Sequence, residues 1–181
     1  MIRARRSRRA VGGRIAKAEL ERLVEAASLA PSCFNMQPWR FIVARGEQAL
    51  ASVKAGLKGG NRWADPAPAI VAVVSRADLD CQLKDGREYY LFDSGMAAEN
   101  LMLQATQQGL IAHPIAGFDS AKVRASLNIP DDYLLICLIV IGRAGDPGQL
   151  PDEELQKMEV MARQRKPLKQ VLAWDTFDFD D

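Results

Sequence analysis

The stretch that contributes most to identifying the fold is Ala30-Pro31-Ser32-Cys33-Phe34-Asn35-Met36-Gln37-Pro38-Trp39. It places three hydroxyl or amide side chains, those of Ser32, Asn35 and Gln37, between Pro31 and Pro38. Polar side chains on a loop held by prolines suit a ligand that presents several hydroxyls and ring heteroatoms. The same side chains could instead bond the backbone of an ordinary capped loop. Taken alone, the residues favour the second interpretation.

Helices and strands are predicted on both sides of this loop. Apolar residues at i, i+3, i+4 and i+7 predict a helix over about residues 17–30, which Pro31 ends. Trp39 to Ala44 and Ala69 to Val74 are short apolar runs typical of strands. Between them we expect a second helix, ended by Gly59-Gly60.

The second half of the chain continues this pattern. A helix over about residues 88–109 is apolar on nearly all sides, which predicts burial in the core or in a subunit interface. His113 to Gly117 is a short predicted strand, and Asp119 is a plausible N-cap for a helix through Leu127. Tyr133 to Ile141 lacks alternation, so we expect a strand buried on both faces.

The tail beyond Gly142 has an unusual composition. A charged, helix-like stretch at about 152–164 precedes six large apolar residues: Leu168, Val171, Leu172, Trp174, Phe177 and Phe179. Such groups require burial, which a partner subunit can provide. We expect one domain over 1–181, of which about 143–181 is a C-terminal extension packing on the partner.

Composition sets further bounds. The chain has 181 residues, is 48% hydrophobic and carries a formal net charge of +1, as expected for one globular domain. Cys33, Cys81 and Cys137 are too few and too scattered for a disulfide framework, and the only histidine is His113, so no metal site is expected. These features indicate a reducing, cytoplasmic location. The apolar runs are too short to span a membrane.

Six arginines lie within the first fourteen residues: Arg3, Arg5, Arg6, Arg8, Arg9 and Arg14. They could form a solvated basic arm or a nucleic-acid patch. They could also hold a phosphate, because guanidinium groups match phosphate oxygens bidentately and Ser7 adds a hydroxyl donor. The nearly neutral net charge argues against nucleic acid.

Four further motifs accompany the polar stretch. They are Arg5-Arg6-Ser7-Arg8-Arg9, Asp93-Ser94-Gly95-Met96-Ala97-Ala98-Glu99-Asn100-Leu101 with Gly109-Leu110 at the helix end, Pro114-Ile115-Ala116-Gly117-Phe118, and Arg165-Lys166-Pro167-Leu168. In this order, from residue 3 to about 168, the chain resembles the FMN-dependent nitroreductases. The resemblance implies an α+β fold with a central mixed or antiparallel sheet flanked by helices. It also implies an intertwined homodimer.

The resemblance assigns an FMN site residue by residue. Arg5, Ser7 and Arg165 match positions that hold the phosphate, Arg6 lines the flavin with its backbone, and Arg9 lies near the ribityl or pyrimidine part. Ser32, Asn35 and Gln37 reach the flavin of the other subunit, and Ala116 and Gly117 match backbone donors that face its N5 and O4. Three prolines or aliphatic residues and one further arginine complete the expected cofactor-binding set: Pro31, Pro114, Ile115 and Arg163.

The implied activity is that of an oxidoreductase. NADH or NADPH would reduce FMN, and nitroaromatic, quinone or related small substrates would then be reduced by ping-pong hydride transfer through flavin N5. The same fold with other flavin chemistry, as in a reductive dehalogenase or dehydrogenase, remains an alternative, as does a non-catalytic flavin-binding protein.

Several side chains stay unassigned in this scheme. No catalytic side chain is named, and the backbone of Ala116 is the group expected near flavin N5. His113 is interpreted as a packed histidine, with a proton-donor role as the alternative, and Cys33 lies in the loop expected to meet the flavin. Asn61 and Arg62 are candidate contacts whose register depends on Gly59-Gly60. Neither a membrane nor a nucleic acid is expected as a partner.

Overall fold

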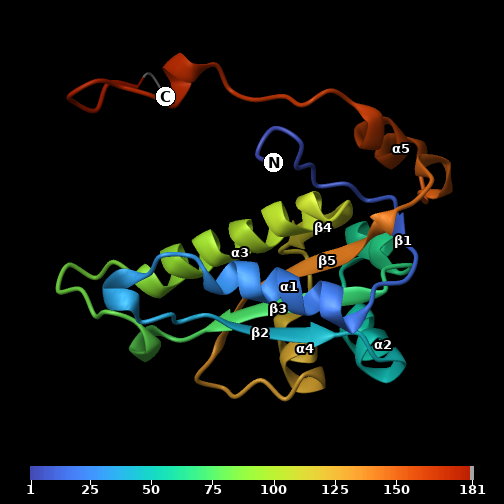
Figure 1. Cartoon of the computed structure of the whole chain (residues 1–181), viewed down its shortest axis with the longest axis horizontal. Coiled ribbons are helices and arrows are strands. Elements are labelled where there is room, and N and C mark those ends of the chain that lie inside the picture. Colours follow the sequence, from blue (N-terminus) through green and yellow to red (C-terminus); the bar gives the residue numbers. More distant parts are fainter. Residues whose placement is uncertain (180–181) are drawn as a thin grey trace.

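The computed structural model describes residues 1–179 and contains a five-stranded sheet between two layers of helices (Figure 1). Its strands are β1 (Val11–Gly12), β2 (Arg40–Ala44), β3 (Ala69–Ser75), β4 (Leu110–Ile115) and β5 (Leu134–Ala144). The path β1-β5-β3-β2 forms the sheet, and β4 also pairs with β5. Every pairing is antiparallel, so the α+β class and the antiparallel sheet are confirmed.

Helices α1 (Lys17–Ser28) and α3 (Tyr89–Gln107) cover one face of the sheet. Leu23 and Leu101 from these helices pack with Val71 and Ile139 from the sheet. The opposite face is covered by α2 (Glu47–Ala55) and α4 (Ser120–Ser126). Strand β3 is buried along its whole length because its side chains alternate between these two cores.

The remaining regular segments are short. They are α5 (Glu153–Val160) and the 3-10 turns η1 (Cys33–Asn35), η2 (Gly59–Ala64), η3 (Ala77–Leu79), η4 (Pro147–Gln149) and η5 (Leu168–Gln170). None of the helices in residues 1–179 combines the length and the apolar character needed to cross a membrane.

Several predicted boundaries differ from the observed ones, and the helix predicted at about 152–164 ends at Val160. Helix α2 ends at Ala55, with Gly56 as its C-cap, and Gly59-Gly60 instead begin η2. Strand β4 begins at Leu110, directly after Gly109, whose φ of 68° ends the α3 segment. It ends at Ile115, so Ala116 and Gly117 lie beyond the strand. The N-cap role of Asp119 is confirmed, because its side chain accepts a hydrogen bond from Lys122 N.

The sequence predicted no disulfide framework, yet two of the three cysteines are joined. Cys33 and Cys81 form a disulfide with a Cα–Cα distance of 6.1 Å, although 48 residues separate them. Cys137 is free. Spacing along the chain could not show this pair, because η1 and the segment after η3 meet only in the folded protein.

The N-terminal arm and the segment that follows α5 lie on the same side of the molecule, beyond α3 (Figure 1). Gly142 allows β1 to approach β5, since a Cβ there would lie 2.0 Å from Val11 Cγ2. Beyond α5 the chain continues as a long extended segment, drawn in red, that stretches away from α5. Its aromatic side chains are exposed, Trp174 to 78% and Phe177 to 82%.

Candidate functional site

Five of the predicted cofactor-binding residues, including the three assigned to the phosphate, line one cavity. Arg5, Arg6 and Ser7 from the N-terminal arm face Arg163 and Arg165 across a volume of about 290 Å³. The neighbours of Arg163 and Arg165 in the sequence complete the lining: Met161, Ala162 and Gln164. The two halves of the cavity are therefore more than 150 positions apart in the sequence.

A buried carboxylate at the end of α5 positions the arm. Glu159 accepts hydrogen bonds from the backbone N–H groups of Arg9, at 2.7 Å, and of Ala10, at 3.2 Å. Arg6 Nη2 donates to Met161 O at 2.7 Å, and Arg163 Nη2 donates to Arg5 O. These bonds hold the arm against residues 159–163 and fix the arginines around the cavity. Glu159 has no distinguishing signal in the sequence, since it is one charge among many on a charged helix.

The cavity is strongly cationic. Burial, followed by the nearby guanidinium groups of Arg165, Arg5 and Arg6, lowers the pKa of Arg163. In the described part of the chain, the acidic side chain that pairs with this cluster is Glu99, whose Oε1 lies 3.4 Å from Arg5 Nε. Several guanidinium groups around one small space suit a multiply charged anion such as a phosphate monoester.

Arg9 does not share this cavity. It lines a larger space of about 600 Å³ with Arg62, Trp63 and Arg143 among the other lining residues. Arg62 Nη1 lies 4.0 Å from Asp65 Oδ1, and both residues line that space. The predicted cationic residues therefore divide into two groups.

The segment after β4 contacts η2. This contact fixes where η2 lies relative to the predicted flavin N5 segment. Asn61 Nδ2 donates to Gly117 O at 2.8 Å, and Trp63 Nε1 donates to Asn61 Oδ1 at 3.2 Å. A Cβ on Gly117 would lie 2.5 Å from Asn61 Nδ2, so a glycine is needed for this contact. Asn61, left ambiguous by the sequence, thus lies directly against the backbone of the predicted N5 segment. Ala116 is exposed beside it.

Pro114 and Ile115 are part of β4 itself. They pair with Ile139 and Leu138 of β5, and Ile115 is buried in the core. They therefore contribute to a site at the end of β4 indirectly, because they anchor the strand that leads into Ala116 and Gly117.

His113 is a packed residue that links three segments. Its Nδ1–H donates to Arg8 O at 3.0 Å, and its ring lies 4.6 Å, centroid to centroid, from that of Trp63. Burial lowers the pKa of the imidazole, and the guanidinium of Arg9 adds to this effect. The neutral imidazole therefore connects the arm and η2 to β4, the strand on which it lies.

This arrangement predicts a pH dependence of stability. The unfolded chain binds a proton at His113 near pH 6.5, above the pKa in the folded state, so acidification favours unfolding. Between pH 7 and 5 the wild type should lose free energy of unfolding relative to His113→Asn, by at most about 1.4 kcal/mol per pH unit. The Asn side chain keeps a donor for Arg8 O and does not titrate. Urea titrations at several pH values measure the difference, and parallel curves for the two proteins would contradict it.

The polar loop has a strained backbone. Phe34, Asn35 and Gln37 have φ values of 47°, 58° and 50°, in the left-handed region that non-glycine residues rarely adopt. Ser32 Oγ accepts from Gln37 N at 3.0 Å, and Gln37 Nε2 donates to Asn35 O at 3.1 Å. Local bonding, the second interpretation of these side chains, is therefore partly present. The loop is also tied down at Cys33 by the disulfide.

The loop and the arginines do not meet within one chain. Pro31 and Ser32 line a separate open groove of about 480 Å³, with Tyr89, Phe92 and Met96 on its other side. Asn35 and Gln37 are exposed. In a single chain, the predicted loop residues and the predicted phosphate residues therefore belong to different surfaces.

Comparison with known proteins identifies the family. The model of the Nitroreductase family matches residues 2–143. The chain belongs to the nitroreductase family. Protein DrgA of Synechocystis sp. is 29% identical over 178 residues, covering 76% of this chain and 83% of that protein. A Thermus thermophilus protein named NADH dehydrogenase is 26% identical over 187 residues, with coverages of 86% and 84%.

A solved structure supports the family at the level of the fold. The crystal structure described as an oxidoreductase containing FMN has a TM-score of 0.88 and 31% identity, over 98% of this chain and 91% of that chain. The nitroreductase match ends at residue 143, so Arg163 and Arg165 lie outside it. Their place in the arginine cavity comes from the geometry of this chain.

Proposed function

We propose that this nitroreductase-family chain is an FMN-dependent oxidoreductase that uses NADH or NADPH to reduce small oxidised substrates. The arginine cavity carries the proposal, because Arg5, Ser7, Arg163 and Arg165 surround a space that fits a phosphate monoester. The solved relative described as containing FMN, which aligns with nearly the whole chain, supports the same cofactor.

The residues beyond the cavity suit the rest of the flavin. Gly117 and the exposed Ala116 would offer backbone N–H donors to the ring, and Asn61 would hold that backbone in place through Gly117 O. A backbone donor is independent of the side chain, so an alanine is acceptable at residue 116. FMN when bound supplies hydride acceptance from a nicotinamide and donation to an oxidised substrate. A shared position for donor and acceptor implies ping-pong kinetics.

We further propose a homodimer in which each flavin lies between subunits. The separation of the 31–37 loop from the arginine cavity supports this arrangement, because Ser32, Asn35 and Gln37 could then serve the flavin held by the partner. The exposed aromatic side chains of the C-terminal segment would be buried on that partner.

Anaerobic flavin reduction tests the activity. The purified full chain, saturated with FMN, should lose its oxidised-flavin absorbance when NADH or NADPH is added. Subsequent addition of a nitroaromatic, a quinone or a halogenated phenol should restore it, and the relative rates separate nitroreductase from dehalogenase chemistry. Tight FMN binding without reduction by either nicotinamide would overturn the proposed enzyme and leave a flavin-binding protein.

A further inference from the structure

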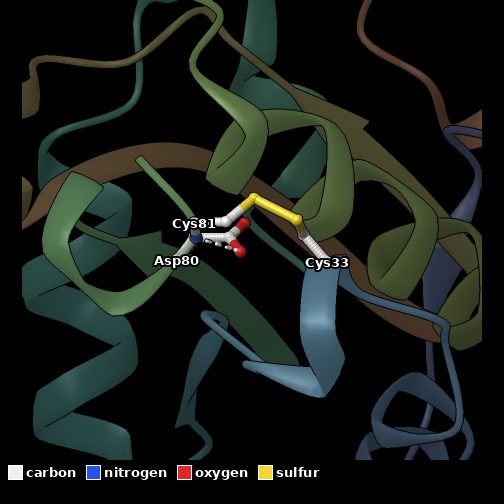
Figure 2. Close-up of side chains that lie close together, drawn as sticks. All are labelled: Cys33, Asp80 and Cys81. Carbon is white, nitrogen blue, oxygen red and sulfur yellow. Dashed lines mark hydrogen bonds between the residues drawn. A yellow bond between two sulfur atoms is a disulfide. The ribbon is translucent and has the colours of Figure 1, made fainter. Parts of the chain in front are cut away.

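A second group of chemically reactive side chains lies away from the arginine cavity. Cys33 in η1 and Asp80-Cys81 after η3 each offer one ligand atom, and these three atoms lie within 4.8 Å of one another. Figure 2 shows the Asp80 carboxylate beside the disulfide that joins the two cysteines. Once this disulfide is reduced, two thiolates and a carboxylate oxygen lie together here and form a set that a divalent metal ion can bind.

Two buried carboxylates make this place unusual. Asp80 is 3% exposed and Asp93, on α3, is fully buried. Each uses one oxygen to accept a cysteine backbone N–H: Asp93 Oδ2 from Cys33 N at 2.8 Å, and Asp80 Oδ1 from Cys81 N at 2.7 Å. Their other oxygens, Asp80 Oδ2 and Asp93 Oδ1, are buried and receive no N–H donor from the described residues. The two carboxyl groups are close enough for a hydrogen bond between them, and burial, followed by the charge and hydrogen bond of Asp93, raises the pKa of Asp80. Two buried carboxyl groups in contact are costly when both are ionised, and a shared proton or a bound cation relieves this cost.

We propose that the reduced form of this protein binds one thiophilic divalent cation, with Zn²⁺ as the best match, through Cys33 Sγ, Cys81 Sγ and Asp80. Thiolates and a carboxylate are ligands that Zn²⁺ accepts in tetrahedral sites. The fourth position is left for water. Asp93 acts as a positioning residue, because its bond to Cys33 N orients the η1 ligand.

Access to the cysteines is available from the surface. Cys33 lines the open groove of about 480 Å³ and is only partly buried, as is Cys81. Cys137 is also partly buried but does not line this groove, and burial raises the pKa of its thiol to about 11. A reductant and a cation can therefore reach the proposed ligands, whereas Cys137 is a matched cysteine outside the site.

The chemistry balances with a dithiol as reductant. The dithiol transfers two electrons and two protons to the Cys33–Cys81 bond, which becomes two thiols, while the dithiol itself is oxidised to a disulfide. Cation binding then releases the two thiol protons and leaves two metal-bound thiolates. In the oxidised protein the disulfide joins the 31–37 loop to the turn after η3. In the reduced protein the cation would join the same two segments.

Metal uptake by the full, FMN-loaded chain tests the proposal. The protein is reduced with a phosphine, incubated with Zn²⁺, freed of unbound metal by gel filtration and analysed for zinc. We expect about one Zn²⁺ per chain after reduction and less than about one tenth of that in the oxidised protein. Equal uptake in both states, or none in the reduced state, would overturn the proposal.

Variants and alkylation locate the ligands. Cys33→Ser and Cys81→Ser should abolish uptake, Asp80→Asn should weaken Zn²⁺ affinity by about tenfold or more, and Cys137→Ser should behave as wild type. In the reduced wild type, which avoids any folding defect of the variants, Zn²⁺ should protect Cys33 and Cys81 from alkylation. Unchanged alkylation of both residues, or full affinity in Asp80→Asn, would contradict the three-ligand site.

Discussion

The Arg5→Ala variant is expected to lose about one to two orders of magnitude in FMN affinity while its affinity for riboflavin stays near the wild-type value. Arg5 lines the arginine cavity with Ser7, Arg163 and Arg165. A hydrogen bond to a charged group contributes about 1.5–3 kcal/mol, and every 1.4 kcal/mol is about tenfold in affinity. Riboflavin lacks the phosphate, so it reports on all contacts except those in the cavity.

Flavin fluorescence titration measures both affinities. Arg3→Ala is the matched control, because Arg3 is an exposed arginine of the same arm that does not line the cavity. Equal losses for FMN and riboflavin in Arg5→Ala would point to a disordered arm. No loss for FMN would remove the cavity as the phosphate site.

Deletion of residues 168–181, the last two of which lie outside the described residues, should produce a monomer that no longer retains FMN. The segment carries Trp174 and Phe177, which are exposed in the single chain, and obligate interfaces of the proposed kind commonly exceed about 2,000 Å². The deletion leaves Arg163 and Arg165 in place, so flavin loss would arise from the missing partner and its 31–37 loop.

Sedimentation velocity and flavin absorbance after gel filtration follow the two effects. The buried core residues lie outside the deleted segment, so the far-ultraviolet circular dichroism spectrum should change little. A double variant, Trp174→Ser with Phe177→Ser, keeps the chain length and should show a weaker form of the same defect. A stable monomer that stays loaded with FMN would contradict the dimer model.

Much of the fold could be predicted from the sequence because the strongest elements are also the most periodic. The apolar runs at β3 and β5 and the spacing of Leu20, Leu23 and Ala27 on α1 predicted elements close to those observed. The boundaries that shifted depend on single glycines, because Gly56 rather than Gly59-Gly60 caps α2. Pattern alone does not decide which of several glycines ends a helix.

The candidate site was predictable only in part. The motifs of the sequence pointed to Arg5, Ser7 and Arg165. The carboxylate of Glu159, which holds the arm in place, belongs to no sequence motif. Likewise, Cys33 and Cys81 are 48 residues apart, and only folding brings them together with Asp80. Pairings of this kind depend on the tertiary structure, so no spacing rule could have indicated them.

The hydrogen bonds that the arm donates to Glu159 have a consequence for how the protein is made. Arg5 and Arg163 line the same arginine cavity but are separated by 158 positions, so the ribosome makes one half of the cavity long before the other. A nascent chain interrupted before residue 163 therefore has an arm without its counterpart. Under the proposed function, such a chain would not hold the FMN phosphate and would remain colourless.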